Sequence, residues 1–275
     1  MTEYTSFGFG DRQRAFQDRH TSFFERFERL REAVNDVFNR TITADELVDP
    51  IVFYLGSRAV DDFLGVLILS ANDNALSATA LLRGMYERVV TARYLHDHPG
   101  ETLAFFEFGV VQQRRTAQQI RRTFPITSAD EHEFEQLEQR YQAVKTKFLV
   151  ACEKCGHQRV GATWSKLDFV SLASKTGDLG DLIVPGYYWP TAQAHATLRS
   201  VESLLEQRAG EPPTLKSKHI DESDRAFQLA YLLLIHVLQI QWDHFKLPLL
   251  EKALEIAAGD YQIVYPPKDE QPLDA

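Results

Sequence analysis

Apolar side chains recur along this chain at the spacing of an α-helix almost from end to end. Near the N-terminus, Phe16, Phe23, Phe27 and Leu30 follow one another at helical intervals. Such intervals place side chains on one face of a helix, which can then be buried against a neighbour. No stretch of four or more residues alternates convincingly with a period of two, and the hairpin dipeptide Asn-Gly is absent. The pattern therefore predicts an all-α fold.

Proline, glycine and capping residues set the expected helix ends. Asp49 and Pro50 suit a helix start, whereas Pro99 and Pro125 end the helices before them. Ser128 and Glu131 have the spacing of a capping box, and Gly156 suits the position after a helix. The expected helices cover residues 11–39, 50–70, 73–96, 100–123, 128–156, 168–175, 191–208 and 222–257, the last bent at Pro248.

Three segments interrupt this pattern. Residues 157–190 are rich in glycine, proline and aromatic residues, which indicates an irregular cap or lid around one short helix. Residues 210–221 contain Pro212 and Pro213 and are expected to be a linker. Residues 259–275 form an acidic tail with three prolines, expected to be extended. The sequence thus predicts a single multi-helix bundle over residues 1–258, followed by this tail.

Composition and charge narrow the functional classes. A chain of 275 residues with 44% apolar residues can build a large core without disulfides or metals. The net charge of -9 argues against bulk attachment to nucleic acid or to an anionic membrane. The longest apolar run, Leu229 to Ile240, is too short to span a bilayer. With two cysteines and no signal peptide, we expect a cytoplasmic protein with no membrane contact and no cofactor.

The helix expected over residues 73–96 carries two charges on an apolar face. Arg83 and Glu87 lie one turn apart, so they can pair with each other. Breaking a buried ion pair costs about 3–5 kcal/mol, and apolar residues often stabilise a core equally well. The pair is therefore either a buried ion pair that fixes helix register or part of a functional site. Its face reads Leu76, Ala80, Arg83, Glu87, Val90 and Tyr94.

His195 is the third candidate catalytic residue. It follows the aromatic segment 187–189 and lies among alanines, so its helix can approach another closely. If His195 meets Arg83 and Glu87, the three form a group for anion binding or proton transfer. Arg83 would hold the anion, Glu87 would orient Arg83 or act as a base, and His195 would transfer a proton.

Other residues are candidates for ligand binding. Tyr188 and Trp164 could close a pocket over Arg83, and the weaker candidate His236 lies in the apolar row of the last helix. A lone histidine in such a row is more often a hydrogen-bonded core residue. Arginines at i and i+7 form a basic face on the helix over residues 100–123, which is either an RNA or acidic-partner surface or a solvated face. They are Arg114, Arg115, Arg121 and Arg122.

Two blocks of sequence carry a resemblance to a known group of proteins. The first is the run 81–87 with Arg83 and Glu87, continuing to Tyr94, Leu95 and Pro99. The second is Trp164, a short helix, Tyr187, Tyr188 and then His195, with Thr191 where the group often has serine. Over residues 75–205 the chain resembles bacterial helical proteins gathered as an uncharacterised family of unknown function. The resemblance implies an all-helical fold and no established activity.

Two further motifs have alternative explanations. Arg93 and His98 have the spacing of helical nucleases linked to prokaryotic defence, in which arginine holds phosphate and histidine is the base. They equally suit a charged helix end. Cys152, Cys155 and His157 resemble half of a zinc knuckle, but a closed zinc site needs a fourth ligand, so two reduced thiols at a helix end are favoured. We therefore predict no metal.

Two functional hypotheses follow. In the first, the site at Arg83 binds or processes a phosphate-bearing ligand such as RNA or a nucleotide, in stress or phage defence, with metal-independent ribonuclease activity as the enzymatic version. In the second, the protein is a non-catalytic interaction or sensor module whose polar cluster is structural. That module would be a homodimer formed through the phenylalanine-rich first helix and the leucine-rich last helix.

Overall fold

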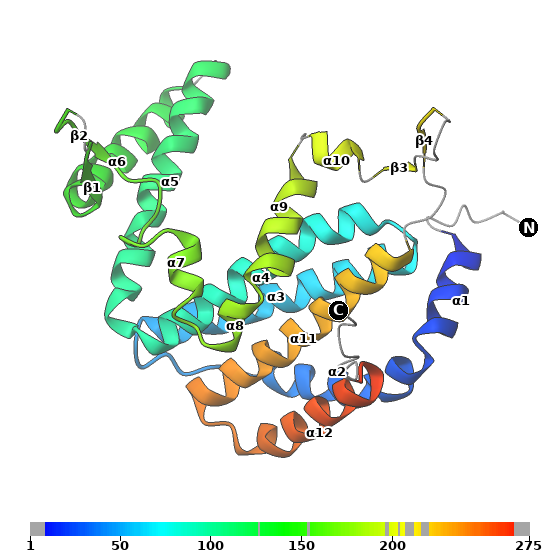
Figure 1. The fold of residues 1–275 in the computed structure, drawn as a ribbon. Helices are drawn as coiled ribbons and strands as arrows, with labels where there is room; N and C mark the ends of the chain where they lie inside the picture. The colour runs from blue at the N-terminus through cyan, green and yellow to red at the C-terminus, as the bar shows by residue number, and fades with distance from the viewer. Residues whose placement is uncertain are drawn as a thin grey trace, which may run out of the picture. The chain divides into compact units, whose positions relative to one another are not determined.

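The computed structural model of the chain describes residues 9–125, 127–152, 155–195, 198–202, 204–206, 212–215 and 220–266. Helices make up almost all of its regular structure, which confirms the expected all-α fold (Figure 1). The chain forms two compact units: the first takes the residues up to His96 and from Ala173 onward, and the second is Asp97–Leu172. The segment expected as one cap is thereby shared, because its first part belongs to the second unit.

Long helices dominate the first unit. Helix α3 packs along α11, and α12 packs against both α2 and α11. Helix α4 lies beside α3, where Gly65 of α3 leaves room for the side chain of Leu81. These helices are α1 (Gly10–Arg19), α2 (Thr21–Phe38), α3 (Val48–Ala71), α4 (Ala75–Asp97), α11 (Ile220–Phe245) and α12 (Pro248–Val264).

Shorter elements between Ala173 and α11 complete the first unit. Gly186 lies directly against the ring of Tyr86 on α4, so close that an added Cβ would fall 2.7 Å from ring atoms. The Tyr86 hydroxyl donates a hydrogen bond to the carbonyl of Leu179 at 2.7 Å. These contacts hold α8 and η3, the first part of this segment, on α4. Its elements are α8 (Asp178–Asp181), the π-helical turn η3 (Val184–Tyr188), α9 (Trp189–Ala194), α10 (Leu198–Glu202) and the hairpin of β3 (Leu205–Glu206) with β4 (Thr214–Leu215).

The phenylalanines of the first unit pack inside it. Phe16 and Phe23 are each 1% exposed and make edge-to-face contacts with Phe227 of α11. The helix expected over residues 11–39 is broken at His20, which leaves helical geometry between α1 and α2. Phe16 and Phe23, which belong to the apolar face expected to form a homodimer, are therefore buried against the protein's own α11.

The second unit is a helical pair with a short hairpin. Helices α5 (Thr102–Thr123) and α6 (Ser128–Val144) pack around Phe108, Val111, Tyr141 and Phe148. Strands β1 (Leu149–Ala151) and β2 (Gln158–Val160) are antiparallel, with Val150 opposite Arg159. The short elements η1 (Pro99–Glu101) and η2 (Lys145–Phe148) precede α5 and β1, and α7 (Phe169–Ala173) spans the boundary of the units.

Several helix ends differ from expectation. The helix expected to reach Gly156 ends at Val144, because the chain turns into a hairpin whose Gly156 has a φ of 67°. The capping box is formed by Thr127 and Asp130, one residue earlier than expected. The helix expected over residues 191–208 stops at Ala194, since His195 is extended with a ψ of 150°.

The C-terminal part also differs. A left-handed residue, Lys246 with a φ of 51°, separates α11 from α12, so Pro248 begins a new helix instead of bending one. Helix α12 continues to Val264, beyond the residue where an extended tail was expected. Most of the expected linker and the end of the tail lie outside the described residues.

Candidate functional site

Arg83, Glu87 and His195 come together on the surface of the first unit. Arg83 Nε donates to Glu87 Oε1 at 2.9 Å, one turn along α4. Arg83 Nη1 lies 3.3 Å from His195 Nε2, at the end of α9. The guanidinium carbon also lies 4.9 Å from the ring centre of Tyr187. The sequence predicted the three polar residues but missed Tyr187 as the aromatic support. We call these four residues the Arg83 cluster.

Burial of this cluster differs from expectation. The Arg83 side chain is 25% exposed and that of Glu87 is 39% exposed. His195 is exposed. The prediction of an ion pair shut away from water is therefore wrong: the face of α4 read as apolar is only partly covered, by η3 and α9. An ion pair this exposed contributes about 0–1 kcal/mol to stability, so the fold does not depend on it.

The carboxylate that is deeply buried is Asp62 of α3. It is 2% exposed and accepts a hydrogen bond from Arg88 Nη1 of α4 at 2.5 Å. Burial raises the pKa of Asp62 despite the nearby positive charge of Arg88. Arg58, one turn before Asp62 on α3, pairs instead with Asp61 on the exposed side of that helix. Asp62 and Arg88 therefore form an ion pair, buried at its carboxylate, that joins α3 to α4. This is the structural role that was one of the two alternatives for Arg83 and Glu87.

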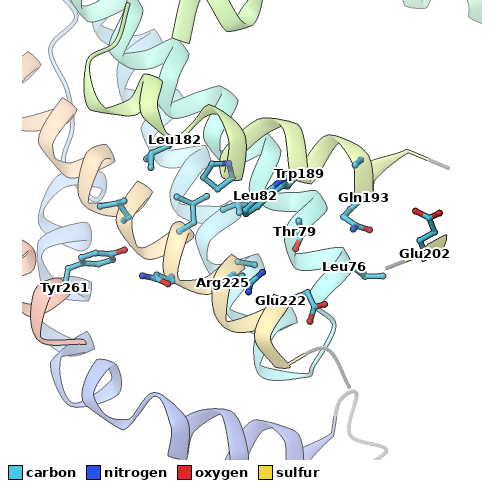
Figure 2. A pocket seen from close by; sticks show the side chains of 16 residues that line it. Leu76, Thr79, Leu82, Leu182, Trp189, Gln193, Glu202, Glu222, Arg225 and Tyr261 are labelled. Carbon is cyan, nitrogen blue, oxygen red and sulfur yellow. The ribbon is translucent and has the colours of Figure 1, made fainter. Parts of the chain in front are cut away.

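A separate cleft lies on the other side of α9. Its volume is about 720 Å³, and it is walled by α4, α11 and the segment from Leu182 to Gln193. Figure 2 shows Leu82 and Thr79 of α4, Trp189 and Gln193 of α9, and Arg225 of α11 around it. None of the Arg83 cluster lines this cleft. No local sequence pattern predicts this cleft, because the residues that line it are far apart along the chain.

Comparison with known proteins gives a family but no activity. A family model described as "Family of unknown function (DUF5677)" matches residues 49–212, more than half of the chain. The chain belongs to DUF5677. This agrees with the resemblance seen in the sequence, and the matched region contains the whole Arg83 cluster. No curated protein and no solved structure matches this DUF5677 chain.

The remaining ligand-binding candidates lie in different surroundings. Tyr188 is 49% exposed and its ring contacts that of Tyr187, so it borders the Arg83 cluster. Trp164 belongs to the second unit, where its ring packs edge-to-face on Phe105. His236 is half-buried on α11, and desolvation lowers the pKa of its imidazole. It does not line the cleft described above.

Most of the basic residues on α5 make contacts within the second unit. Arg114 Nε donates to Glu138 of α6 at 2.6 Å, and its guanidinium lies over the Tyr141 ring. Arg115 donates to the carbonyl of Gly161 at 2.6 Å. Arg121 lies over the ring of Phe134. Arg122 is exposed. Three of the four therefore help to pack this unit, which reduces the basic face expected for RNA.

The arginine and histidines at the end of α4 are tied to neighbouring helices. Arg93 Nη1 lies 2.6 Å from Asp243 Oδ2 on α11. His96 Nδ1 lies 3.0 Å from His244 Nδ1, and His244 Nε2 lies 3.0 Å from Asp49. Burial acts to raise the pKa of Asp49, but hydrogen bonds from two backbone N–H groups and from His244 together lower it below the ordinary value. Arg93 thus has a structural carboxylate partner.

The cysteine motif forms part of the hairpin. Cys152 is half-buried and Cys155 is exposed, and neither forms a disulfide within the described residues. The backbone N–H of Cys152 donates to the carbonyl of His157 at 2.9 Å. Within the described ranges, no three His, Cys, Asp or Glu side chains are grouped as a metal site requires. In the same part of the chain, no helix combines the length and apolar character needed to cross a bilayer.

Proposed function

We propose that this protein binds a phosphate-bearing ligand, such as a nucleotide or RNA, at the Arg83 cluster, and that it acts as a binding or sensor module. The main support for the proposal is that three neighbouring residues fix the orientation of the Arg83 guanidinium. Glu87 fixes its Nε, His195 contacts its Nη1, and Tyr187 supports the guanidinium plane.

The outer edge of Arg83 remains available. Nη2 makes no hydrogen bond or ion pair with any residue that the structure describes. A guanidinium nitrogen with two N–H groups, already oriented and partly exposed, can donate to a phosphate oxygen with little loss of side-chain entropy. This pre-organisation supports anion binding better than it supports a role in stability.

The same contacts favour binding over catalysis. A neutral His195 must use the lone pair on Nε2 to accept from Arg83 Nη1, so that nitrogen cannot also take a proton from a substrate. One oxygen of Glu87 is likewise taken by Arg83 Nε. A general base needs a free lone pair within reach of the proton it removes. Catalysis would therefore require the cluster to rearrange.

Tyr188 gives the site a means to recognise more than phosphate. Its exposed ring lies next to Tyr187 and is 5.7 Å from it, centre to centre. Nucleobases stack on exposed aromatic rings, and such contacts are worth about 1–3 kcal/mol per base. A nucleotide or an RNA strand therefore fits the cluster better than inorganic phosphate does.

A binding experiment tests the proposal. Adenosine monophosphate and a fluorescent single-stranded RNA of ten nucleotides are titrated against the wild-type protein and against Arg83→Met, which keeps the apolar stem. We expect Arg83→Met to weaken both interactions by about tenfold or more, because charged hydrogen bonds contribute about 1.5–3 kcal/mol. Its melting temperature should change by less than about 2–4 °C, as for an exposed ion pair.

Arg58→Met is the matched control. Arg58 also pairs with a carboxylate on its own helix, and both partners are largely exposed. We expect its affinities to stay within twofold of the wild type. The proposal is overturned if Arg83→Met binds both ligands as well as the wild type does, or if the wild type binds neither ligand. Cleavage of the RNA by the wild type but not by His195→Ala would instead establish the enzymatic alternative.

A further inference from the structure

The cleft beside α9 has the size and the walls of a small-molecule site. Its volume of about 720 Å³ lies within the range of about 300–1,000 Å³ found for ligand pockets. Most of its walls are apolar, with Leu82 from α4, Leu182, Pro185 and Trp189 from the α9 segment, and Leu229 and Leu232 from α11. Such walls stabilise the apolar body of a ligand by removing it from water.

One cation lies among these walls. Arg225 of α11 lines the cleft and has no hydrogen bond or ion pair to any part of the chain that the structure describes. Figure 2 shows it between Tyr261 and Glu222. An arginine beside an apolar surface can pair with a carboxylate in a bidentate manner. Arg225 therefore indicates an anionic head group on the ligand.

Two carboxylates limit how much negative charge the ligand can bring. Glu222, one turn before Arg225, and Glu202 of α10 also line the cleft. In Figure 2 both lie toward the Gln193 side, away from Tyr261. Like charges repel, so a di- or triphosphate would be disfavoured, whereas a single carboxylate can be satisfied by Arg225 alone.

We propose that this cleft binds an amphipathic monoanion, a small carboxylic acid with an aliphatic or aromatic body. The apolar body would lie against Leu82, Trp189 and Leu229, and the carboxylate would accept hydrogen bonds from Arg225. This site is separate from the Arg83 cluster, so the proposal does not rest on phosphate binding there.

Three ligands of equal chain length isolate the contribution of the head group. Octanoate, 1-octanol and octylammonium are titrated into the full chain by isothermal titration calorimetry. We expect octanoate to bind with a dissociation constant on the order of 0.1–1 mM, in line with the efficiency of small ligands. It should bind about tenfold more tightly than octanol, and octylammonium should bind more weakly than either.

Two variants and two controls locate the binding. Arg225→Gln should remove the preference for octanoate over octanol, while Arg83→Met should leave it unchanged. Thr79→Trp should narrow the cleft at α4 and weaken the binding of octanoate. Ala258→Trp places the same side chain in a different, smaller hollow between α11 and α12 and should have no effect. Because Arg225 is exposed, Arg225→Gln remains informative even if Thr79→Trp does not fold.

Each contrary outcome overturns the proposal. If octylammonium binds most tightly, the carboxylates and not Arg225 determine the ligand. Equal binding of octanoate by the wild type and Arg225→Gln removes the arginine from the site. Absence of binding by all three ligands removes the cleft. None of these results affects the phosphate-binding test, which depends on Arg83.

Discussion

Individual charged residues in the first unit differ in their chemistry according to what surrounds them. Asp62 is buried between α3 and α4, and burial raises its pKa even beside Arg88. Asp224 is also desolvated, yet hydrogen bonds from His20 and Arg19 hold its pKa below the ordinary value. Glu87 is only partly covered, with 39% of its side chain exposed to water. A sequence shows that each is charged, but not how many donors surround it.

His236 makes the stability of the protein depend on pH. Desolvation, followed by the charge of Arg93, lowers the pKa of this imidazole in the folded chain, and Asp178 opposes the effect. The unfolded chain therefore binds a proton near its ordinary pKa of about 6.5, where the folded chain does not. The contribution of His236 to the free energy of unfolding therefore keeps its full value above that pH. It decreases as the pH falls from there toward the pKa of His236 in the folded chain. We expect His236→Leu to lessen the loss of stability between about pH 7.5 and pH 5.5.

Urea unfolding at several pH values measures this effect. His132→Leu is the control, since His132 is exposed on α6 and should leave the pH dependence unchanged. A His236→Leu variant whose unfolding free energy follows the wild-type pH dependence would contradict the assignment.

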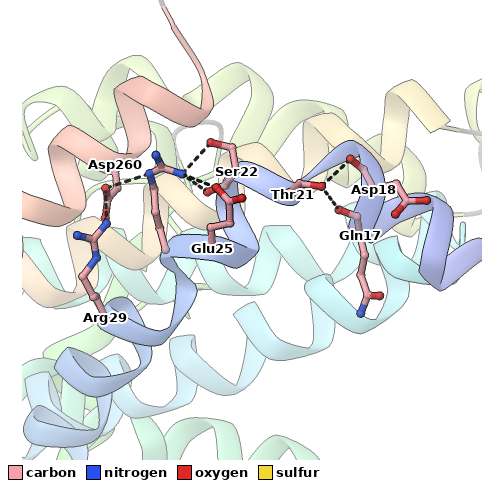
Figure 3. A network of polar contacts seen from close by, with 8 residues as sticks. Gln17, Asp18, Thr21, Ser22, Glu25, Arg29 and Asp260 are labelled. Carbon is pink, nitrogen blue, oxygen red and sulfur yellow. Dashed lines mark hydrogen bonds and ion pairs between the residues drawn. The ribbon is translucent and has the colours of Figure 1, made fainter.

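The helices show where the sequence predicted the bounds of secondary structure and where it did not. Helices α3, α4 and α5 were predicted within about two residues, because proline and periodic apolar residues fix their positions. The end of α12 was missed. Asp260, a residue of the expected extended tail, is 8% exposed. Its carboxylate accepts hydrogen bonds from Arg29 at 2.9 Å and forms an ion pair with Arg26, both on α2 (Figure 3). That tertiary contact stabilises the last turns of the helix and has no local sequence signal.

The approach of η3 to α4 depends on one glycine. An added Cβ at Gly186 would meet the Tyr86 ring at 2.7 Å, and Tyr86 is held in place by its hydrogen bond to Leu179. We expect Gly186→Ala to lower stability by about 1–3 kcal/mol, as overpacking does, and to weaken phosphate binding because Tyr187 and His195 shift away from Arg83. Thermal unfolding and ligand titration check both effects.

Gly109→Ala is the matched control. Gly109 lies inside α5 with no atom near the added methyl group, so alanine should be neutral or slightly stabilising. If Gly186→Ala melts at the wild-type temperature and binds equally well, the close approach does not position the Arg83 cluster.

The whole molecule could be predicted as all-α, but not how its residues are grouped. Periodicity gives helices without their partners, so the division into two units, the short hairpins and the cleft could not be derived. The convergence of Arg83, Glu87 and His195 was predicted from an apolar stripe and a run of alanines. The exposure of these three residues was not predicted, because the apolar stripe on α4 does not show how short the segment that covers it is.

The packing of the whole first unit also bears on self-association. Phe23 is 1% exposed and contacts Phe227 and Tyr231 of α11. Phe23→Ala should therefore cost about 3–5 kcal/mol of stability and leave the molar mass of the folded protein unchanged. Thermal unfolding together with light scattering after size exclusion measures both. Phe9→Ala, at a residue 58% exposed, is the control with little expected effect. A fall in molar mass with stability retained would restore the dimer hypothesis.

Helix α9 is a single short rod with different neighbours on its two sides. His195 at its end and Tyr187 just before it contact Arg83, whereas Trp189 and Gln193 line the cleft. A ligand in the cleft that favours one position of α9 must alter the affinity of the Arg83 cluster for an anion. Thermodynamic linkage then requires the anion to alter the affinity of the cleft for its ligand by the same factor. Binding of one ligand in the cleft and binding of a different ligand at Arg83 are in this way coupled through the six residues of α9.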